Sequence, residues 1–130
     1  MGEYEDTLND IKATLGIVPG FMKALPEDAL VQDWPLFKKY TGGQSAIPGK
    51  YRELGGLMAA ANIKCPYCAL FHTEMAKMNG ATEEELSEIF FLASFTARWS
   101  AVIHAQLYDY DTFANELQQI GAYLQKTAKK

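Results

Sequence analysis

The stretch that decides the fold is ELGGLMAAANIKCPYCALFH, residues 53–72. Its first half is rich in Ala, Gly and Leu and shows no strand-like alternation, so it indicates a helix that ends near Asn62. A two-residue connector then leads into Cys65-Pro66-Tyr67-Cys68. Because proline suits the first position of a helix, a second helix is expected to begin at Pro66 with Cys65 as its N-cap. The stretch therefore predicts a helix–connector–helix unit with a dithiol at the second N-terminus.

Helical spacing of apolar residues accounts for nearly all of the remaining chain. We expect helices near residues 3–15, 26–40, 50–62, 66–78, from 82 onward, 96–108 and 112–126, and a short turn of helix near 21–25. Pro35 is expected to break or bend the helix at 26–40, and Thr82 with Glu85 forms a capping box. Whether the last two helices are one bent helix stays open. With no alternating run long enough for a strand, the prediction is an all-α single domain over residues 1–130, with six to seven helices.

Composition narrows the class of partner. The net charge of −4 argues against binding to nucleic acid, because proteins that bind nucleic acid present a basic face to it. Residues 1–10 are acidic and polar, without the start of an export signal, and no segment is expected to reach the ~18 apolar residues of a membrane span. We therefore expect a cytoplasmic protein that does not enter a membrane. Seven aromatic residues between Phe90 and Phe113 are many for the surface of one small unit, which predicts a homo-oligomer.

The two cysteines and His72 fit thiol–disulfide chemistry. On a helix, Cys65, Cys68 and His72 fall within an arc of roughly 60°. Residues three apart lie ~5–6 Å apart, within disulfide range. The free N–H groups and the dipole at a helix N-terminus favour thiolate over thiol, and His72 can accept the proton of Cys68. No cofactor is expected beyond a redox-active Cys65–Cys68 disulfide.

Other uses of these residues are weaker. Both cysteines could be small buried hydrophobes. Cys65, Cys68 and His72 could hold zinc together with Glu53 or His104, but a structural zinc site needs a second ligand pair at recognisable spacing, so we expect no metal. His104 is expected to be a hydrogen-bonded packing histidine.

Glu53 lies twelve residues before Cys65, beside a buried stripe. From spacing alone it could be a solvated flank paired with Lys50 or Arg52, or the carboxylate that a dithiol site needs. The pattern of Glu53, Cys65-x-x-Cys68 and His72 resembles the signature of the alkylhydroperoxidase D family, in the carboxymuconolactone decarboxylase superfamily. The resemblance extends over about residues 47–95. Cys-Pro-Tyr-Cys is also the glutaredoxin dithiol sequence, but the helix before it excludes that fold.

The resemblance implies an all-helical chain that assembles into trimers or hexamers. It also implies a dithiol that cycles between reduced and disulfide forms, with Glu53 and His72 as a proton relay. A peroxide or disulfide would be the substrate, and a lipoyl-, thioredoxin- or peroxiredoxin-type protein could donate thiols. Some peroxidatic members have histidine between the cysteines; here Tyr67 stands there, and we assign it an accessory role in tuning access or potential.

The sequence thus predicts a dithiol oxidoreductase that reduces peroxides, disulfides or both. Exposure at the N-cap favours Cys65 as the cysteine that meets a partner, whereas closeness to His72 favours Cys68 as the one that attacks peroxide. Two alternatives stay open: decarboxylation of a lactone acid, for which Arg52 and Arg98 are the only arginines, and a non-enzymatic redox sensor.

Overall fold

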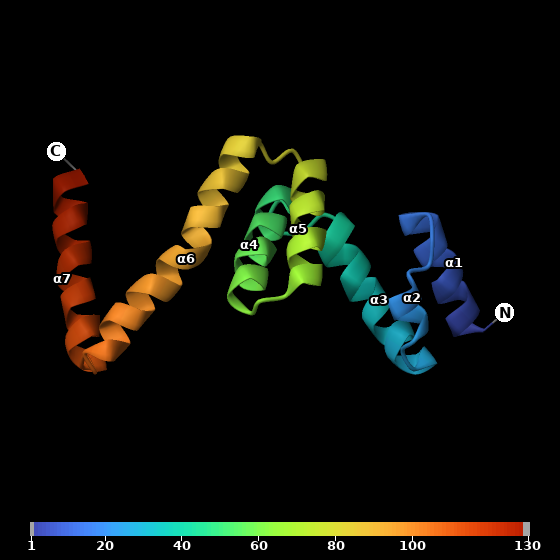
Figure 1. Ribbon diagram of the computed structural model, residues 1–130, viewed down its shortest axis with the longest axis horizontal. Coiled ribbons are helices and arrows are strands. Elements are labelled where there is room, and N and C mark those ends of the chain that lie inside the picture. The colour runs from blue at the N-terminus through green and yellow to red at the C-terminus, as the bar shows by residue number, and fades with distance from the viewer. Residues whose placement is uncertain (1, 129–130) are drawn as a thin grey trace.

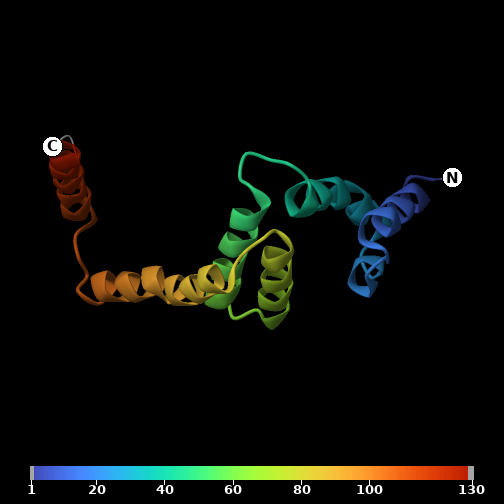
Figure 2. The same ribbon diagram turned by 90° about the horizontal axis from the view of Figure 1, so that it is seen from above.

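The computed structural model describes residues 2–128, and within them every regular element is an α-helix (Figure 1). The helices are α1 (Glu3–Leu15), α2 (Gly20–Lys23), α3 (Glu27–Gly42), α4 (Gly49–Asn62), α5 (Pro66–Met78), α6 (Glu83–Ala105) and α7 (Tyr110–Ala128). The predicted all-α class is confirmed, and so are the bounds expected for α1 and α5. The chain is drawn out, with its two ends at opposite extremes of the long axis (Figures 1 and 2).

The first three helices form a unit with a hydrophobic cluster of its own. Ile11, Met22, Leu30 and Trp34 are its buried members. The Trp34 indole N–H donates to the Asp10 carboxylate at 2.7 Å. This bond, aided by the Lys38 ammonium, holds the pKa of Asp10 below its ordinary value of 3.8. The unit is thus stabilised by an apolar cluster and by the hydrogen bond between Trp34 and Asp10.

Of the break or bend expected at Pro35, the break is wrong, because α3 runs from Glu27 to Gly42 with Pro35 inside it. A proline inside a helix removes one backbone hydrogen bond and is unfavourable in isolation. Trp34 immediately before it and Leu30 one turn before Trp34 are almost fully buried against α1 and α2. Tertiary packing here outweighs the local cost.

A second hydrophobic cluster joins α4, α5 and the start of α6. Its buried members are Leu54, Leu57, Ala76 and Leu86. The predicted capping box is present, with Glu85 N–H donating to Thr82 Oγ1 and Thr82 N–H donating to the Glu85 carboxylate. The same carboxylate forms an ion pair with the Lys50 ammonium of α4, at 2.9 Å between Nζ and Oε2. These contacts fix the direction in which α6 leaves the unit.

The helices expected from residue 82 onward and at residues 96–108 are one continuous helix, α6. No glycine or proline interrupts residues 83–105, so nothing in the sequence stops the helix. The chain turns only after Ala105, where Leu107 takes a left-handed φ of 53°. Asp109 then caps α7 by accepting from the Thr112 N–H. The last two predicted helices are therefore separate.

Helices α6 and α7 form an arm that extends away from both clusters (Figures 1 and 2). Among the described residues, α7 buries none and α6 buries only Leu86. By length and composition alone α6 is long and apolar enough to cross a membrane, although a single such helix does not establish a span. Arg98 and Glu88 lie within it, and amphipathic α7 follows directly. Apolar side chains stay exposed along both helices: Phe90, Phe91, Phe95, Trp99, Val102, Phe113, Leu117, Ile120 and Leu124.

We expect the apolar face of this arm to be covered by other copies of the chain. Light scattering coupled to size exclusion should give a mass several times that of one chain. Leu117→Lys, on the apolar face of α7, should shift the protein toward smaller species, because a charge in an interface core is costly. Gln118→Lys, on the opposite face, is the matched control and should leave the mass unchanged. A monomeric wild-type protein would contradict the expectation.

Candidate active site

Glu53 is a buried carboxylate on α4. It follows Pro48, the N-cap of α4, by little more than one helical turn and is 3% exposed; the buried Leu54 comes next and the buried Leu57 follows one turn later. The solvated-flank alternative is therefore excluded. An ionised group taken out of water needs a partner, and the partner of Glu53 lies on the next helix.

That partner is His72 of α5, whose Nδ1 lies 2.7 Å from Glu53 Oε2. The bond leaves Nε2 as the ring nitrogen available to other groups, and the His72 side chain keeps 28% of its surface exposed. One end of the imidazole is thus fixed by a buried acid while the ring still reaches solvent. This arrangement can hold an imidazolium in place and pass on its proton.

Gly56 provides the space in which the His72 ring lies. A Cβ on Gly56 would stand 2.5 Å from Cε1, 2.6 Å from Nδ1 and 2.7 Å from Nε2 of that ring, closer than packed atoms allow. A Cβ on Gly55 would meet nothing within 4 Å. Of the two adjacent glycines, only Gly56 therefore lies under the imidazole ring.

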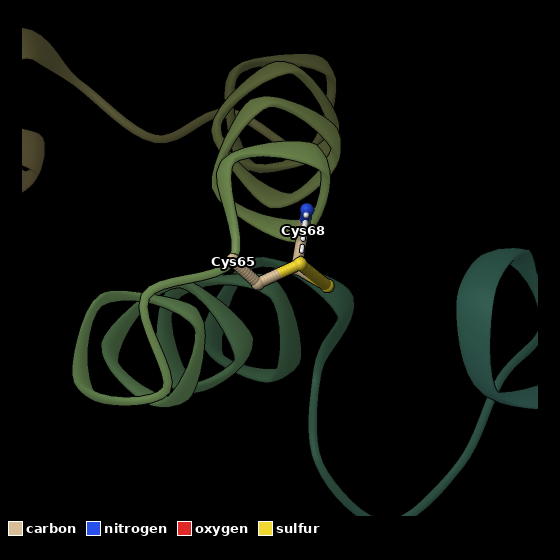
Figure 3. Close-up of a disulfide and its surroundings, with 2 residues drawn as sticks. All are labelled: Cys65 and Cys68. Atoms are coloured by element: carbon tan, nitrogen blue, oxygen red, sulfur yellow. Dashed lines mark hydrogen bonds between the residues drawn. A yellow bond between two sulfur atoms is a disulfide. The ribbon is translucent and has the colours of Figure 1, made fainter.

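Cys65 and Cys68 are joined by a disulfide at the N-terminus of α5, with their Cα atoms 5.3 Å apart (Figure 3). Cys65 is the N-cap, as predicted, and its Sγ accepts a 3.1 Å hydrogen bond from the Cys68 N–H. Lys64, just before it, has a left-handed φ of 60°, which turns the chain from α4 into α5. After reduction, the same N–H and the positive helix end favour a thiolate.

A cavity of about 670 Å³ opens beside the dithiol and contains Cys68 and His72 in its wall. Tyr67, 85% exposed, stands in the same wall. Cys65 is not part of that wall and reaches the cavity only through its bond to Cys68. The other lining residues are Phe21, Phe37, Thr41 and Phe71.

The sequence analysis missed those four residues. Phe71 could have been found, because it follows Cys68 by three positions and therefore shares its helix face. Phe21 and Phe37 come from α2 and α3, and no spacing relates them to the dithiol.

The remaining candidates lie elsewhere. His104 Nδ1 donates to the Ser100 carbonyl oxygen one turn earlier on α6, as a hydrogen-bonded histidine does, although it is exposed rather than packed. Arg52 donates to the carbonyl oxygens of Lys39 and Gly43 and to Ser45 Oγ, and so ties the end of α3 to α4. Within residues 2–128, no three His, Cys, Asp or Glu side chains are grouped as a metal site would require.

Comparison with known proteins agrees with this geometry. The crystal structure of the alkylhydroperoxidase AhpD core from Rhodospirillum rubrum superposes with a TM-score of 0.73 and 26% sequence identity, over 86% of each chain. No curated protein matches the sequence. The model of the carboxymuconolactone decarboxylase family matches residues 29–108, which include both cysteines, Glu53 and His72. The chain belongs to the carboxymuconolactone decarboxylase family and has the fold of the alkylhydroperoxidase AhpD core.

Proposed function

We propose that the protein is a dithiol oxidoreductase that reduces peroxides, and disulfides by the same pair of cysteines. One observation carries the proposal: the buried Glu53 carboxylate holds His72 at 2.7 Å, and His72 shares a cavity with a cysteine of the redox pair. A buried acid, then an imidazole, then a thiol, each next to the following one in space, are the parts of a proton relay. The similarity to the AhpD core supports the same activity.

With a peroxide, the cycle begins when Cys68 gives its proton to His72, and Glu53 stabilises the imidazolium. The Cys68 thiolate attacks the outer oxygen of the peroxide, so that an S–O bond forms and the O–O bond breaks. The leaving oxygen takes the proton from His72 and departs as an alcohol or water. Cys65 then attacks the sulfenic acid on Cys68, which forms the disulfide and releases the hydroxyl as water.

An external dithiol returns two electrons and two protons, and the disulfide opens by exchange through a mixed disulfide. Cys65 is the better candidate for this step, because it stands at the helix end outside the cavity wall. With a disulfide substrate, the same two sulfurs act in the same way: one forms the mixed disulfide and the other displaces it. We place this cycle in the cytoplasm, where thiol donors of the lipoyl, thioredoxin or peroxiredoxin type are available, and in a homotrimer or homohexamer.

Lactone decarboxylation, the activity after which the family is named, fits this cavity less well. Binding a carboxylate substrate calls for a cation or several hydrogen-bond donors. Neither arginine of the chain lines the cavity, and Arg52 already donates to three oxygens near the end of α3. A role as redox sensor uses the same disulfide but gives no reason for a buried acid behind His72.

Single cysteine variants test the proposal directly. Cys68→Ser should lose peroxide turnover almost completely, because it removes the attacking sulfur. Cys65→Ser should still consume about one equivalent of peroxide and then stop with a sulfenic acid on Cys68, which mass spectrometry after dimedone trapping would detect. Turnover by both variants at the wild-type rate would refute a dithiol mechanism.

The adjacent glycines of α4 give a matched test of the relay. Gly56→Ala should slow peroxide-driven disulfide formation by roughly 10²-fold, because the added methyl displaces the His72 ring from its place beside Glu53. Gly55→Ala, at an open position on the same helix, should keep the rate and stabilise the protein by about 0.5–1 kcal/mol. Circular dichroism establishes that both variants fold. Equal rates in the two variants would remove the role given to the His72 ring position.

A further inference from the structure

A row of aromatic side chains connects the His72 ring to the N-terminal unit that α1, α2 and α3 form. The Phe71 ring meets the His72 imidazole in a T-shaped arrangement, with 5.3 Å between the ring centroids. Phe71 also meets Phe37 of α3 at 6.3 Å, and Phe37 stacks on Trp34 at 5.8 Å. The row therefore runs from the hydrophobic cluster of the N-terminal unit to the helix that carries the dithiol.

The α3 end of this row is firmly held. Trp34 is 3% exposed within the hydrophobic cluster, and its indole N–H donates to a carboxylate of α1. Arg52 of α4 donates to two carbonyl oxygens at the end of α3, which fixes α3 against the helix that carries the buried acid. Phe37 thus has a defined position relative to α4, and it gives Phe71 a support that comes from outside α5.

The His72 ring needs such a support. Its bond to Glu53 selects one orientation, and the atoms packed against the ring decide how often it leaves that orientation. The His72 side chain is 28% exposed, so water can compete for Nδ1 whenever the ring turns. Gly56 has no side chain with which to hold the ring. Phe71 is 38% exposed, and without a contact on α3 its own ring could adopt other rotamers.

We propose that Phe37 is a positioning residue for His72, which acts through Phe71 to keep the imidazole hydrogen-bonded to Glu53. This inference rests on the proposed function and names a residue that controls the same site. Aromatic pairs attract one another in edge-to-face and offset arrangements, so Phe71 loses a favourable contact when it turns away from Phe37. The N-terminal unit in this way influences the proton relay without supplying a reacting group.

The first measurement follows the Nδ1 proton of His72 by NMR in the oxidised protein, where no peroxide is needed. A proton that an imidazole donates to a buried carboxylate exchanges with water only when the bond opens. Phe37→Leu keeps an apolar side chain beside Trp34 but removes the ring, and should make this exchange about tenfold faster. Phe37→Tyr keeps the ring and should keep the exchange slow. Leu36→Ala, an exposed position on α3 outside the cavity wall, is the control and should not change it.

A double variant tests the route through Phe71. Phe71→Leu should speed the exchange at least as much as Phe37→Leu does. Adding Phe37→Leu to Phe71→Leu should change nothing further, because the connecting ring is already gone. In the pre-reduced protein, either single variant should slow disulfide formation with hydrogen peroxide by about tenfold. Hydrogen peroxide is the oxidant because it is too small to need either ring for binding, and circular dichroism establishes that the variants fold.

Three results would overturn this inference and leave the proposed function standing. The first is the absence of a slowly exchanging Nδ1 proton in the wild-type protein. The second is an exchange rate that neither Phe37→Leu nor Phe71→Leu changes. The third is effects that multiply in the double variant, because Phe37 would then act on His72 by another route. A wild-type dithiol that hydrogen peroxide does not oxidise would instead overturn the proposed peroxide reduction, and with it the role of Phe37 in that reaction.

Discussion

The hydrogen bond between Glu53 and His72 is the interaction on which the rest of the site depends. It joins α4 to α5, gives the buried Glu53 carboxylate a partner and fixes the orientation of the His72 imidazole. A buried carboxylate without that partner would be costly, and an imidazole without that acid would be free to turn. Gly56 makes the geometry possible, because any side chain there would occupy the position of the ring. Helix packing and the proposed proton relay therefore depend on the same geometry, in which the His72 imidazole lies over Gly56.

The dithiol depends on a second feature, the start of α5. Pro66 begins the helix, Cys65 caps it, and the left-handed turn at Lys64 brings the chain from α4 into this position. The redox pair thus sits at the positive end of a helix, and His72 follows Cys68 by one turn. The N-terminal unit closes the other side of the cavity with aromatic rings, and the α6–α7 arm carries apolar surface outward. In the proposed function, the reacting groups, the cavity wall and the surface for assembly come from different parts of one short chain.

Much of this could be predicted from local sequence. The dithiol helix and its N-cap follow from Pro66, and the start of α6 follows from Thr82 and Glu85, because caps are set by residues a few positions apart. Tertiary packing decided the rest. Pro35 remains inside α3 because Leu30 and Trp34 are buried beside it. The continuity of α6, by contrast, is a local property, because no glycine or proline interrupts residues 83–105. The cavity wall formed by Phe21 and Phe37 could not be read from spacing, since those residues meet α5 only once the chain has folded. The role of Glu53 could not be decided from the sequence for the same reason: its burial depends on neighbours from another helix.

The most direct test of the relay is the pH dependence with which Cys68 in the reduced protein reacts with iodoacetamide, followed by mass spectrometry. In wild type, the account predicts a midpoint well below the value of about 8.5 that an ordinary thiol shows. Glu53→Gln, which keeps the shape of the side chain but removes its charge, should move the midpoint upward. Glu74→Gln, an exposed position on the same helix as His72, should not move it. A midpoint near 8.5 in wild type that does not respond to Glu53→Gln would contradict the central claim that Glu53 and His72 activate the dithiol.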